Sequence, residues 1–347
     1  MLEIYAGSKA LKQIKEEGFH QALFTSFLAA SGGAKFFSIY QINRFLFDDF
    51  FKSRDTELNL LGSSAGAFQS ACIAQNNPSS ALDRLAINYA ETTYSKNAKP
   101  SEITAKARTL LDNVLGENGV NEILNNKIFK PHFVVAKSNG LVSFENKYLQ
   151  GIGLLNSYIR NKINRRLLNK QYQRFVYHSP LSNFSFDCLD NIDTFHVALN
   201  EENLKHALLA SGSIPLVMEG IKDIPHSPKG MYRDGGIIDY HFDLKLNDTG
   251  LTIYPHFNNS PKAGWFDKNS KRTFRKENYD KTVLICPSPA FINSLPYSKI
   301  PDRNDFITMD DDTRIKYWKK VFEDTKRLVK ELQDFILFQR IEKIKPL

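Results

Sequence analysis

The segment "LNLLGSSAGAFQSACIAQ", residues 58–75, decides the fold of this chain. Its apolar start is typical of a buried strand, and the small residues that follow Gly66 favour a helix. Between them lies Ser64, in the pattern Gly-x-Ser-x-Gly. A strand-to-helix turn this tight crowds the backbone, and a glycine on each side relieves the crowding. The pattern therefore predicts an accessible hydroxyl at a helix start, where backbone N–H groups attract negative charge.

The same pattern has a second interpretation, a glycine-rich turn in which the serine only caps the helix. Because Gly and Ser are common residues, Gly-x-Ser-x-Gly arises by chance in roughly one chain in ten of this length. The choice between a nucleophile and a cap therefore depends on the rest of the sequence.

Strand-like and helix-like segments alternate around this turn. We expect a strand over 22–30, a helix over 36–51, and helices over most of 80–128. Further strands are expected over 132–138, 174–179, 194–199, 251–257 and 282–288. From about Asp311 the chain reads as one long amphipathic helix. This alternation predicts an α/β fold, a mostly parallel sheet with helices on its faces.

Composition narrows the classes of partner. The chain has 347 residues, enough for a large core, and a formal net charge of +8. Such an excess indicates an anionic partner, a lipid surface or nucleic acid, but no zinc-finger, helix-turn-helix or RNP pattern supports nucleic acid. The three cysteines are far apart and predict reduced thiols rather than disulfides. The histidines lack metal-ligand spacing, so we expect no metal and no cofactor.

The N-terminal residues are charged and lack the apolar core of a secretory signal peptide. No window of about 18 apolar residues predicts a transmembrane helix. We therefore expect a cytoplasmic protein that associates peripherally with a membrane. Delivery into another cell stays open.

Two more segments offer chemistry that a nucleophilic serine needs. In "SGGAK", residues 31–35, consecutive N–H groups can form an anion-binding nest, and "DGG" places Asp234 before two glycines. A serine nucleophile requires a base for its proton and donors for the oxyanion. Asp234 is the candidate base, and the N–H groups of Gly32, Gly33 and Ala34 are the candidate donors. Each segment alone also fits a plain turn, but their order along the chain favours the catalytic interpretation.

In that order the segments resemble the marks of the patatin-like phospholipases. These marks are a glycine-rich oxyanion loop followed by a basic residue, a G-x-S-x-G elbow, an A-S-x-x-[IP]-P segment and a D-G-[GA] loop. The matching residues are 32–35, 62–66, 210–215 and 234–236. The resemblance covers roughly residues 22–240. Ser31 replaces the usual third glycine of the loop, and Phe36 replaces the glycine after the basic residue, which predicts a narrowed approach to the loop.

The resemblance implies a three-layer α/β sandwich and a lipid acyl hydrolase of phospholipase A or lysophospholipase type. It places the nucleophile at Ser64, the catalytic aspartate at Asp234 and the oxyanion hole at Gly32, Gly33 and Ala34. The reaction would then use a Ser–Asp dyad and an acyl-enzyme, without metal or cofactor. Lys35 would either pair with the substrate phosphate or close the turn. The lipid, the position cleaved, an activating partner and the oligomeric state stay open.

Two other functions remain possible at this point. A Ser–His–Asp hydrolase also uses Gly-x-Ser-x-Gly, and only His241 and His256 follow Asp234. An inactive lipid-binding or protein-binding module on the same fold is the other. We expect the hydrolase domain to occupy residues 1–300, with a helical extension over 301–347.

The segment 147–175 holds seven basic residues and no acid. As a helix it would carry one apolar stripe, formed by Ile152, Leu155, Ile159, Ile163 and Leu167. An apolar stripe flanked by Lys and Arg is how a helix lies on an anionic bilayer. The sequence therefore predicts a basic amphipathic insertion whose membrane contacts are Arg160, Arg165, Arg166 and Lys170. The alternative is an ordinary core-facing helix with a solvated basic side.

Overall fold

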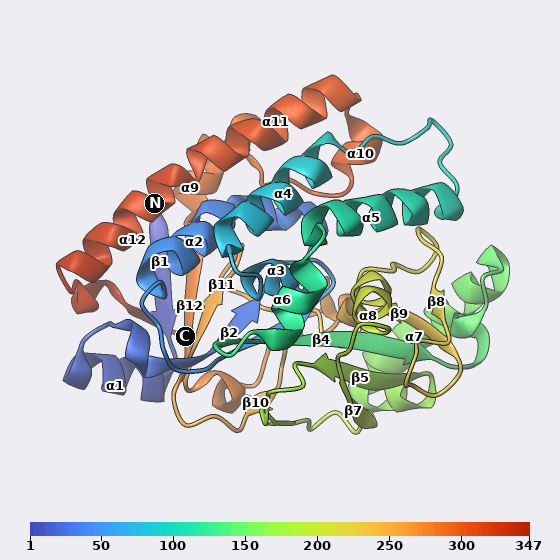
Figure 1. Ribbon diagram of the computed structural model, residues 1–347, viewed down its shortest axis with the longest axis horizontal. Helices are drawn as coiled ribbons and strands as arrows, with labels where there is room; N and C mark the ends of the chain where they lie inside the picture. The colour runs from blue at the N-terminus through green and yellow to red at the C-terminus, as the bar shows by residue number, and fades with distance from the viewer.

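An eleven-stranded mixed sheet runs through the centre of the computed structural model, which describes all residues 1–347 (Figure 1). Its main order is β13-β1-β12-β11-β2-β3-β4-β5-β7, with β8 and β9 attached beside β4. The pairings from β12 through β11, β2 and β3 to β4 are all parallel. Helices flank this sheet, so the predicted α/β sandwich with a mostly parallel sheet is confirmed.

The strands of the main sheet are β1 (Leu2–Ala6), β2 (Phe24–Ala29), β3 (Leu58–Ser63), β4 (Phe129–Ser138), β5 (Tyr172–His178), β7 (Thr194–Ala198), β8 (Ile221–Lys222), β9 (Met231–Asp234), β11 (Leu251–Pro255), β12 (Thr282–Pro287) and β13 (Lys345–Pro346). A separate pair is formed by β6 (Phe186–Asp187) and β10 (Lys245–Leu246). The helices are α1 (Ser8–Glu17), α2 (Tyr40–Phe45), α3 (Ala65–Ile73), α4 (Pro78–Glu91), α5 (Pro100–Leu115), α6 (Gly119–Asn125), α7 (Lys147–Ile163), α8 (Leu204–Ser211), α9 (Pro289–Ser294), α10 (Asp305–Thr308), α11 (Asp311–Asp324) and α12 (Lys326–Leu337).

Strand β4 is shared by two partners on one edge. Along its first part it pairs in parallel with β3, up to Ser63 opposite Val134. Its remaining residues pair antiparallel with β9, beginning with Asp234 opposite Val135. The other edge of β4 holds β5. The two strands that meet on β4 therefore end at adjacent positions, and their last residues are brought side by side.

Each expected strand is present, and the expected helices differ in detail. The helix expected over 36–51 is a 3-10 helix (Gly33–Ser38), then α2 and one π-helical turn. The region 80–128, expected to be mostly helical, contains most of α4 and all of α5 and α6. The insertion expected over 147–175 ends as a helix at Ile163, and β5 begins at Tyr172. None of the helices has the length and apolar character needed to cross a bilayer.

The prediction of one long C-terminal helix is wrong in one respect, because the segment forms two helices. Thr325 separates α11 from α12, which lie nearly end to end across the top of Figure 1. Asp310 caps α11 by accepting a hydrogen bond from the Thr313 N–H at 2.9 Å. After α12 the chain returns to the sheet edge as β13, which pairs with β1.

The C-terminal segment shares the core of the sheet domain. Trp318 is fully buried, and its ring centroid lies 5.1 Å from that of Phe37, next to the glycine loop. Its indole N–H donates to Asp305 at 2.9 Å. Residues 301–347 are thus part of the packing that holds the glycine loop in place.

Replacing Trp318 by Ala should cost about 3–5 kcal/mol of unfolding free energy, because it empties a large buried site. Lys316→Ala, an exposed change on the same helix, is the control and should stay within about 0.5 kcal/mol. Chemical denaturation measures both. A small effect of Trp318→Ala would show that 301–347 is an extension separate from the core.

Candidate active site

Ser64 lies at the sharp turn between β3 and α3. Its backbone angles, φ 53° and ψ −129°, are strained for a residue with a side chain. The flanking glycines permit the turn, since a Cβ atom on Gly62 would lie 2.3 Å from the Gly66 carbonyl oxygen. A Cβ atom on Gly66 would lie 2.2 Å from the Ala29 carbonyl oxygen of β2. The elbow predicted from the sequence is therefore present, and its glycines are required by close backbone contacts.

Ser64 and Asp234 form a hydrogen-bonded pair. The Ser64 hydroxyl donates to Asp234 Oδ2 at 2.8 Å, and Asp234 Oδ1 accepts from the Gly236 N–H at 2.7 Å. The Gly236 bond orients the carboxylate, so that its other oxygen accepts the hydrogen bond from the Ser64 hydroxyl. The two residues come from strands that meet on β4, although 170 positions separate them in the chain.

Burial raises the pKa of Asp234 above its ordinary value. The hydrogen bonds from Ser64 and Gly236 oppose this shift, and so do the positive charges of Arg303 and Lys268. A raised pKa makes the carboxylate a better proton acceptor, because basicity moves closer to the working pH.

The Ala-Ser-Gly-Ser-Ile-Pro segment holds both members of this pair. Ser211 Oγ accepts from the Ser64 N–H at 3.0 Å and donates to the Val134 carbonyl at 2.7 Å. The Ser213 carbonyl accepts from the Asp234 N–H at 3.0 Å. The motif was visible in the sequence, but this positioning role became clear only from the contacts.

The glycine loop lies beside the elbow. Gly32 and Gly33 have φ angles of 118° and 59°, and they start the 3-10 helix Gly33–Ser38. The N–H groups of Gly32, Gly33 and Ala34 donate to no protein acceptor. Ser31 Oγ is hydrogen-bonded to the Ser63 carbonyl and to Ser63 Oγ, both at 2.7 Å. The serine that replaces a glycine thus fastens the loop to the elbow and leaves three backbone donors unpaired.

The family model of the patatin-like phospholipases matches residues 59–241, which is more than half of the chain. The chain belongs to this family. Among solved structures, VipD from Legionella pneumophila is similar at 12% identity, with a TM-score of 0.31. That similarity covers 75% of this chain and 54% of VipD, so the chain spans about half the length of that protein. A search of curated proteins finds no match.

Two residues near the loop carried predictions from the patatin-like pattern, a narrowed approach at Phe36 and one of two roles for Lys35. Phe36 does not narrow the approach, because its ring is buried against Phe37 at a centroid distance of 4.5 Å. Lys35 forms an ion pair with Asp302, with Nζ 2.6 Å from the carboxylate oxygen. Its charge is therefore already compensated within the protein.

Neither late histidine contacts the Ser64–Asp234 pair. His241 Nδ1 accepts from the Lys262 N–H at 2.8 Å, and His256 Nδ1 lies within hydrogen-bond distance of the Asn258 backbone. Both rings are buried, and burial lowers their pKa values, to about 3 for His256. The hydrogen bonds of the site thus match a Ser–Asp pair rather than a Ser–His–Asp triad.

Two cations of the site were missed by sequence reasoning. The side-chain stem of Arg303 lies against Gly33, where an added Cβ atom would be 3.1 Å from it. Lys268 Nζ lies 4.2 Å from the ring centroid of Tyr240. Both follow the family match in the chain, and no local pattern around them indicates a site.

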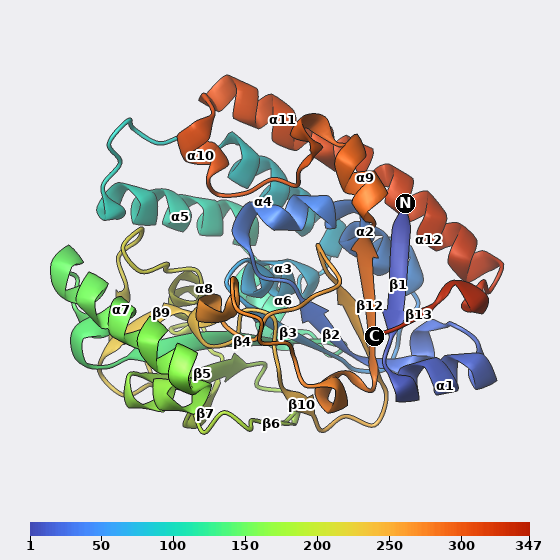
Figure 2. The same cartoon turned by 180° about the vertical axis from the view of Figure 1, so that it is seen from behind.

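Helix α7 lies at the end of the molecule away from β1 and α12 (Figure 2). It packs through Leu154 and through small or polar residues, which are Gln150, Gly153, Ser157 and Asn161. The predicted apolar stripe faces outward, with Ile152 58%, Leu155 59% and Ile163 72% exposed. Ile159 of the stripe is also exposed, and Tyr148 extends this face, whereas Leu167 lies beyond the end of α7 and is half-buried. The helix is therefore not an ordinary core-facing one.

One predicted membrane contact is wrong. Arg165 is largely buried, and its guanidinium lies 3.4 Å from Asp267 and 3.5 Å from Asp190. The two carboxylates draw it inward, so it cannot reach a surface. Arg166 and Lys170 are exposed, and Arg160 is half-buried with a hydrogen bond to Asn156 at 2.7 Å.

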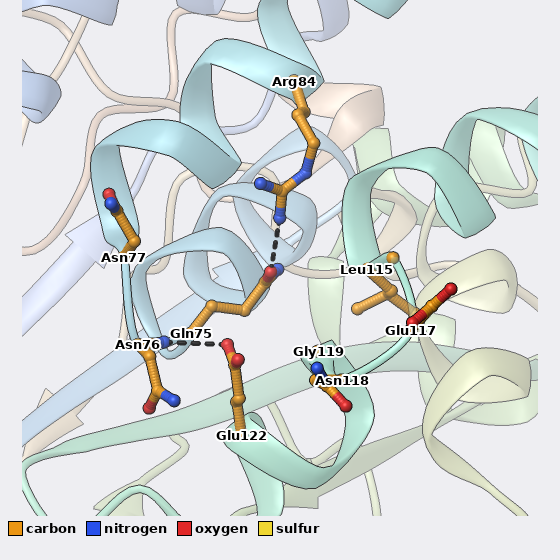
Figure 3. A pocket seen from close by; sticks show the side chains of 10 residues that line it. Gln75, Asn76, Asn77, Arg84, Leu115, Glu117, Asn118, Gly119 and Glu122 are labelled. Carbon is orange, nitrogen blue, oxygen red and sulfur yellow. Dashed lines mark hydrogen bonds between the residues drawn. The ribbon is translucent and has the colours of Figure 1, made fainter.

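A polar hollow at the other end of α3 does not belong to this site. Gln75, Arg84 and Glu122 line it, and Arg84 donates to Gln75 at 2.7 Å (Figure 3). The length of α3 separates it from Ser64.

Replacing Asp234 by Asn should stabilise the fold at pH 7. A raised folded-state pKa means that the protonated form is favoured by folding, so this stability is present at low pH and lost as pH rises through the folded pKa. At neutral pH the buried carboxylate therefore lowers stability, and Asn avoids that cost. Thermal unfolding should show a higher Tm for Asp234→Asn at pH 7 and a smaller difference near pH 4. A lower Tm at pH 7 would contradict the desolvated carboxylate.

Proposed function

We propose that this chain hydrolyses acyl esters of lipids, with Ser64 as the nucleophile and Asp234 as its base. The observation that carries the proposal is the 2.8 Å hydrogen bond from the Ser64 hydroxyl to Asp234 Oδ2 at a strained elbow. Membership of the patatin-like family supports the substrate class.

In this mechanism Ser64 Oγ attacks the ester carbonyl carbon while its proton passes to Asp234 Oδ2. The carbonyl oxygen becomes an oxyanion, for which the unpaired N–H groups of Gly32, Gly33 and Ala34 are the candidate donors. The C–O bond then breaks, and the departing alcohol takes the proton from Asp234. This leaves an acyl group on Ser64. Water attacks the acyl carbon and gives a proton to Asp234. The bond between the acyl carbon and Ser64 Oγ then breaks, Asp234 returns the proton to Ser64 Oγ, and the carboxylic acid is released.

A carboxylate is a weak base for a hydroxyl, so position must supply what basicity lacks. Gly236 fixes the carboxylate and Ser211 fixes the Ser64 backbone, each through a hydrogen bond. These bonds support a preorganised pair whose proton transfer needs little movement.

Ser64→Ala should lower hydrolysis of a short-chain ester at least about a thousandfold, because the nucleophile is gone. A matched control is Ser70→Ala, a buried serine of α3 outside the pair. Initial rates with purified protein measure both. Equal turnover by the wild type and Ser64→Ala would overturn Ser64 as the nucleophile, and turnover by neither would make the inactive binding module the better interpretation.

We further propose that α7 is the surface that meets the lipid. Its exposed face is aliphatic and aromatic, and a water-soluble protein gains nothing by exposing so many of these groups on one helix. Five of the seven basic residues of 147–175 accompany that face, since Arg165 and Arg174 are buried in ion pairs. Apolar side chains beside cations complement an anionic bilayer.

The α7 face is connected to the catalytic pair. Gln150 of α7 accepts from the Leu216 N–H at 2.6 Å. Leu216 directly follows the Ser211–Pro215 segment that positions Ser64 and Asp234, and it is 37% exposed together with Val217 at 40%. Exposed apolar groups therefore extend from α7 toward the residues that hold the site.

The triple change Ile152→Ser, Leu155→Ser and Ile159→Ser should weaken binding to anionic vesicles about 100-fold, at about 1 kcal/mol for each partly inserted side chain. Lys162→Gln, Arg166→Gln and Lys170→Gln together should weaken binding at low salt and much less at high salt. Vesicle sedimentation measures both sets.

Matched controls lie elsewhere on the surface. Ile87, Ile307 and Leu337 are also exposed, and their replacement by Ser should leave vesicle binding unchanged. Lys106→Gln, Arg108→Gln and Lys330→Gln serve the same purpose for charge. Wild-type binding by the α7 aliphatic variant would remove α7 as the membrane surface.

A further inference from the structure

Two cations beside the catalytic pair have no anionic partner. Lys268 follows the 3-10 helix Trp265–Asp267, and Arg303 lies just before α10. No carboxylate oxygen lies within 4.0 Å of either charged group, and neither side chain donates a hydrogen bond. The three fully buried arginines, Arg174, Arg233 and Arg314, all form ion pairs, whereas Lys268 and Arg303 form none.

The carboxylate next to Arg303 in the chain forms an ion pair with a different lysine. Asp302 directly precedes Arg303 in the chain, but its Oδ2 atom lies 2.6 Å from Lys35 Nζ. The basic residue of the oxyanion loop is thereby neutralised. Any anion that enters the site must find its positive charge elsewhere.

Arg303 and Lys268 lie where such an anion would enter. Arg303 packs on Gly33, with its Cγ 3.1 Å and its Cδ 3.2 Å from an added Cβ atom there. Lys268 lies over the Tyr240 ring, whose hydroxyl would be 3.1 Å from a Cβ atom on Gly32. Arg303 thus contacts one glycine of the oxyanion loop, and the Tyr240 ring lies between Lys268 and the other.

Their charges act on each other and on the catalytic carboxylate. Burial and then Arg303 lower the pKa of Lys268 to about 8. Both cations lower the pKa of Asp234, against the effect of its burial. Two like charges held together without a counter-ion are unfavourable, and an arriving anion removes that cost.

We propose that Arg303 and Lys268 form the site for the phosphate of a glycerophospholipid whose acyl ester is attacked by Ser64. Arg303 offers a planar pair of donors suited to phosphate oxygens, and Lys268 offers a single point charge. In this arrangement Lys35 pairs with Asp302 and so stabilises the glycine loop. This proposal rests on the proposed hydrolase function and names the feature by which the site recognises its substrate.

The test compares two substrates with identical short acyl chains, a monomeric phosphatidylcholine and the matching diacylglycerol. They differ only by the phosphate-bearing headgroup. Arg303→Gln and Lys268→Gln should each lower the ratio of kcat/KM for phospholipid to kcat/KM for diacylglycerol about 10-fold, and the double variant about 100-fold. Arg108→Gln, an exposed arginine of α5, is the matched control and should leave the ratio unchanged.

Two further readouts separate substrate binding from an effect on Asp234. Inorganic phosphate should inhibit diacylglycerol hydrolysis by the wild type and lose this effect in the double variant. Raising the pH from 7 to 9 discharges Lys268, which faces Arg303, Asp234, Lys35 and Asp302 as well as the rings of Tyr240 and Trp265. The substrate ratio should fall over that range in the wild type and stay flat in Lys268→Gln.

Equal losses on both substrates, with no phosphate inhibition, would overturn the proposal and assign the two cations to tuning Asp234. A wild type that cleaves neither substrate would instead overturn the hydrolase function. Selective loss on the phospholipid in Lys35→Met, with none in the double variant, would return the phosphate to Lys35.

Discussion

The edge of β4 at Val134 and Val135 is the constraint on which the site depends. Ser63 ends its pairing opposite Val134, and Asp234 begins its pairing opposite Val135. The Val134 carbonyl also accepts from Ser211, and a Cβ atom on Gly235 would lie 2.0 Å from that oxygen. Three separate motifs of the family thus meet at one peptide group. Their glycines and serines are small because the backbones around them are in contact.

A buried ionic network connects β5 and the segment after α7 to the residues around this edge. Arg174 of β5 is fully buried and pairs with Asp239 at 2.5 Å and Asp190 at 2.7 Å. The Asp239 carbonyl accepts from Ser63 Oγ at 2.5 Å. Arg165 joins the same carboxylates and donates to the Ile238 carbonyl. Because an unpaired charge here would be costly, the network fastens the end of the α7 segment to the residue before the nucleophile.

The sequence predicted what is local and missed what depends on distant pairing. The elbow, the glycine loop and the Asp234 loop have short patterns that only a few backbone conformations satisfy. The position of Asp234 beside Ser64 follows from strand order, which periodicity does not contain. Arg165 was misplaced because Asp190 and Asp267, which pull it inward, lie 25 and 102 positions away. For the same reason no sequence pattern indicated Arg303. Its neighbour Asp302 neutralises Lys35, the lysine for which the family pattern suggested a phosphate contact.

The features that lower stability gather around this one edge. Ser64 has strained backbone angles, Asp234 is a buried carboxylate with a raised pKa, and Arg303 and Lys268 lack counter-ions. Helix α7 exposes the face that a stable fold would bury. Elsewhere the chain follows ordinary rules, with one large core and paired buried charges. Such departures persist where function needs them. In the proposed function a phospholipid would place its phosphate beside the two cations and its apolar surface against α7.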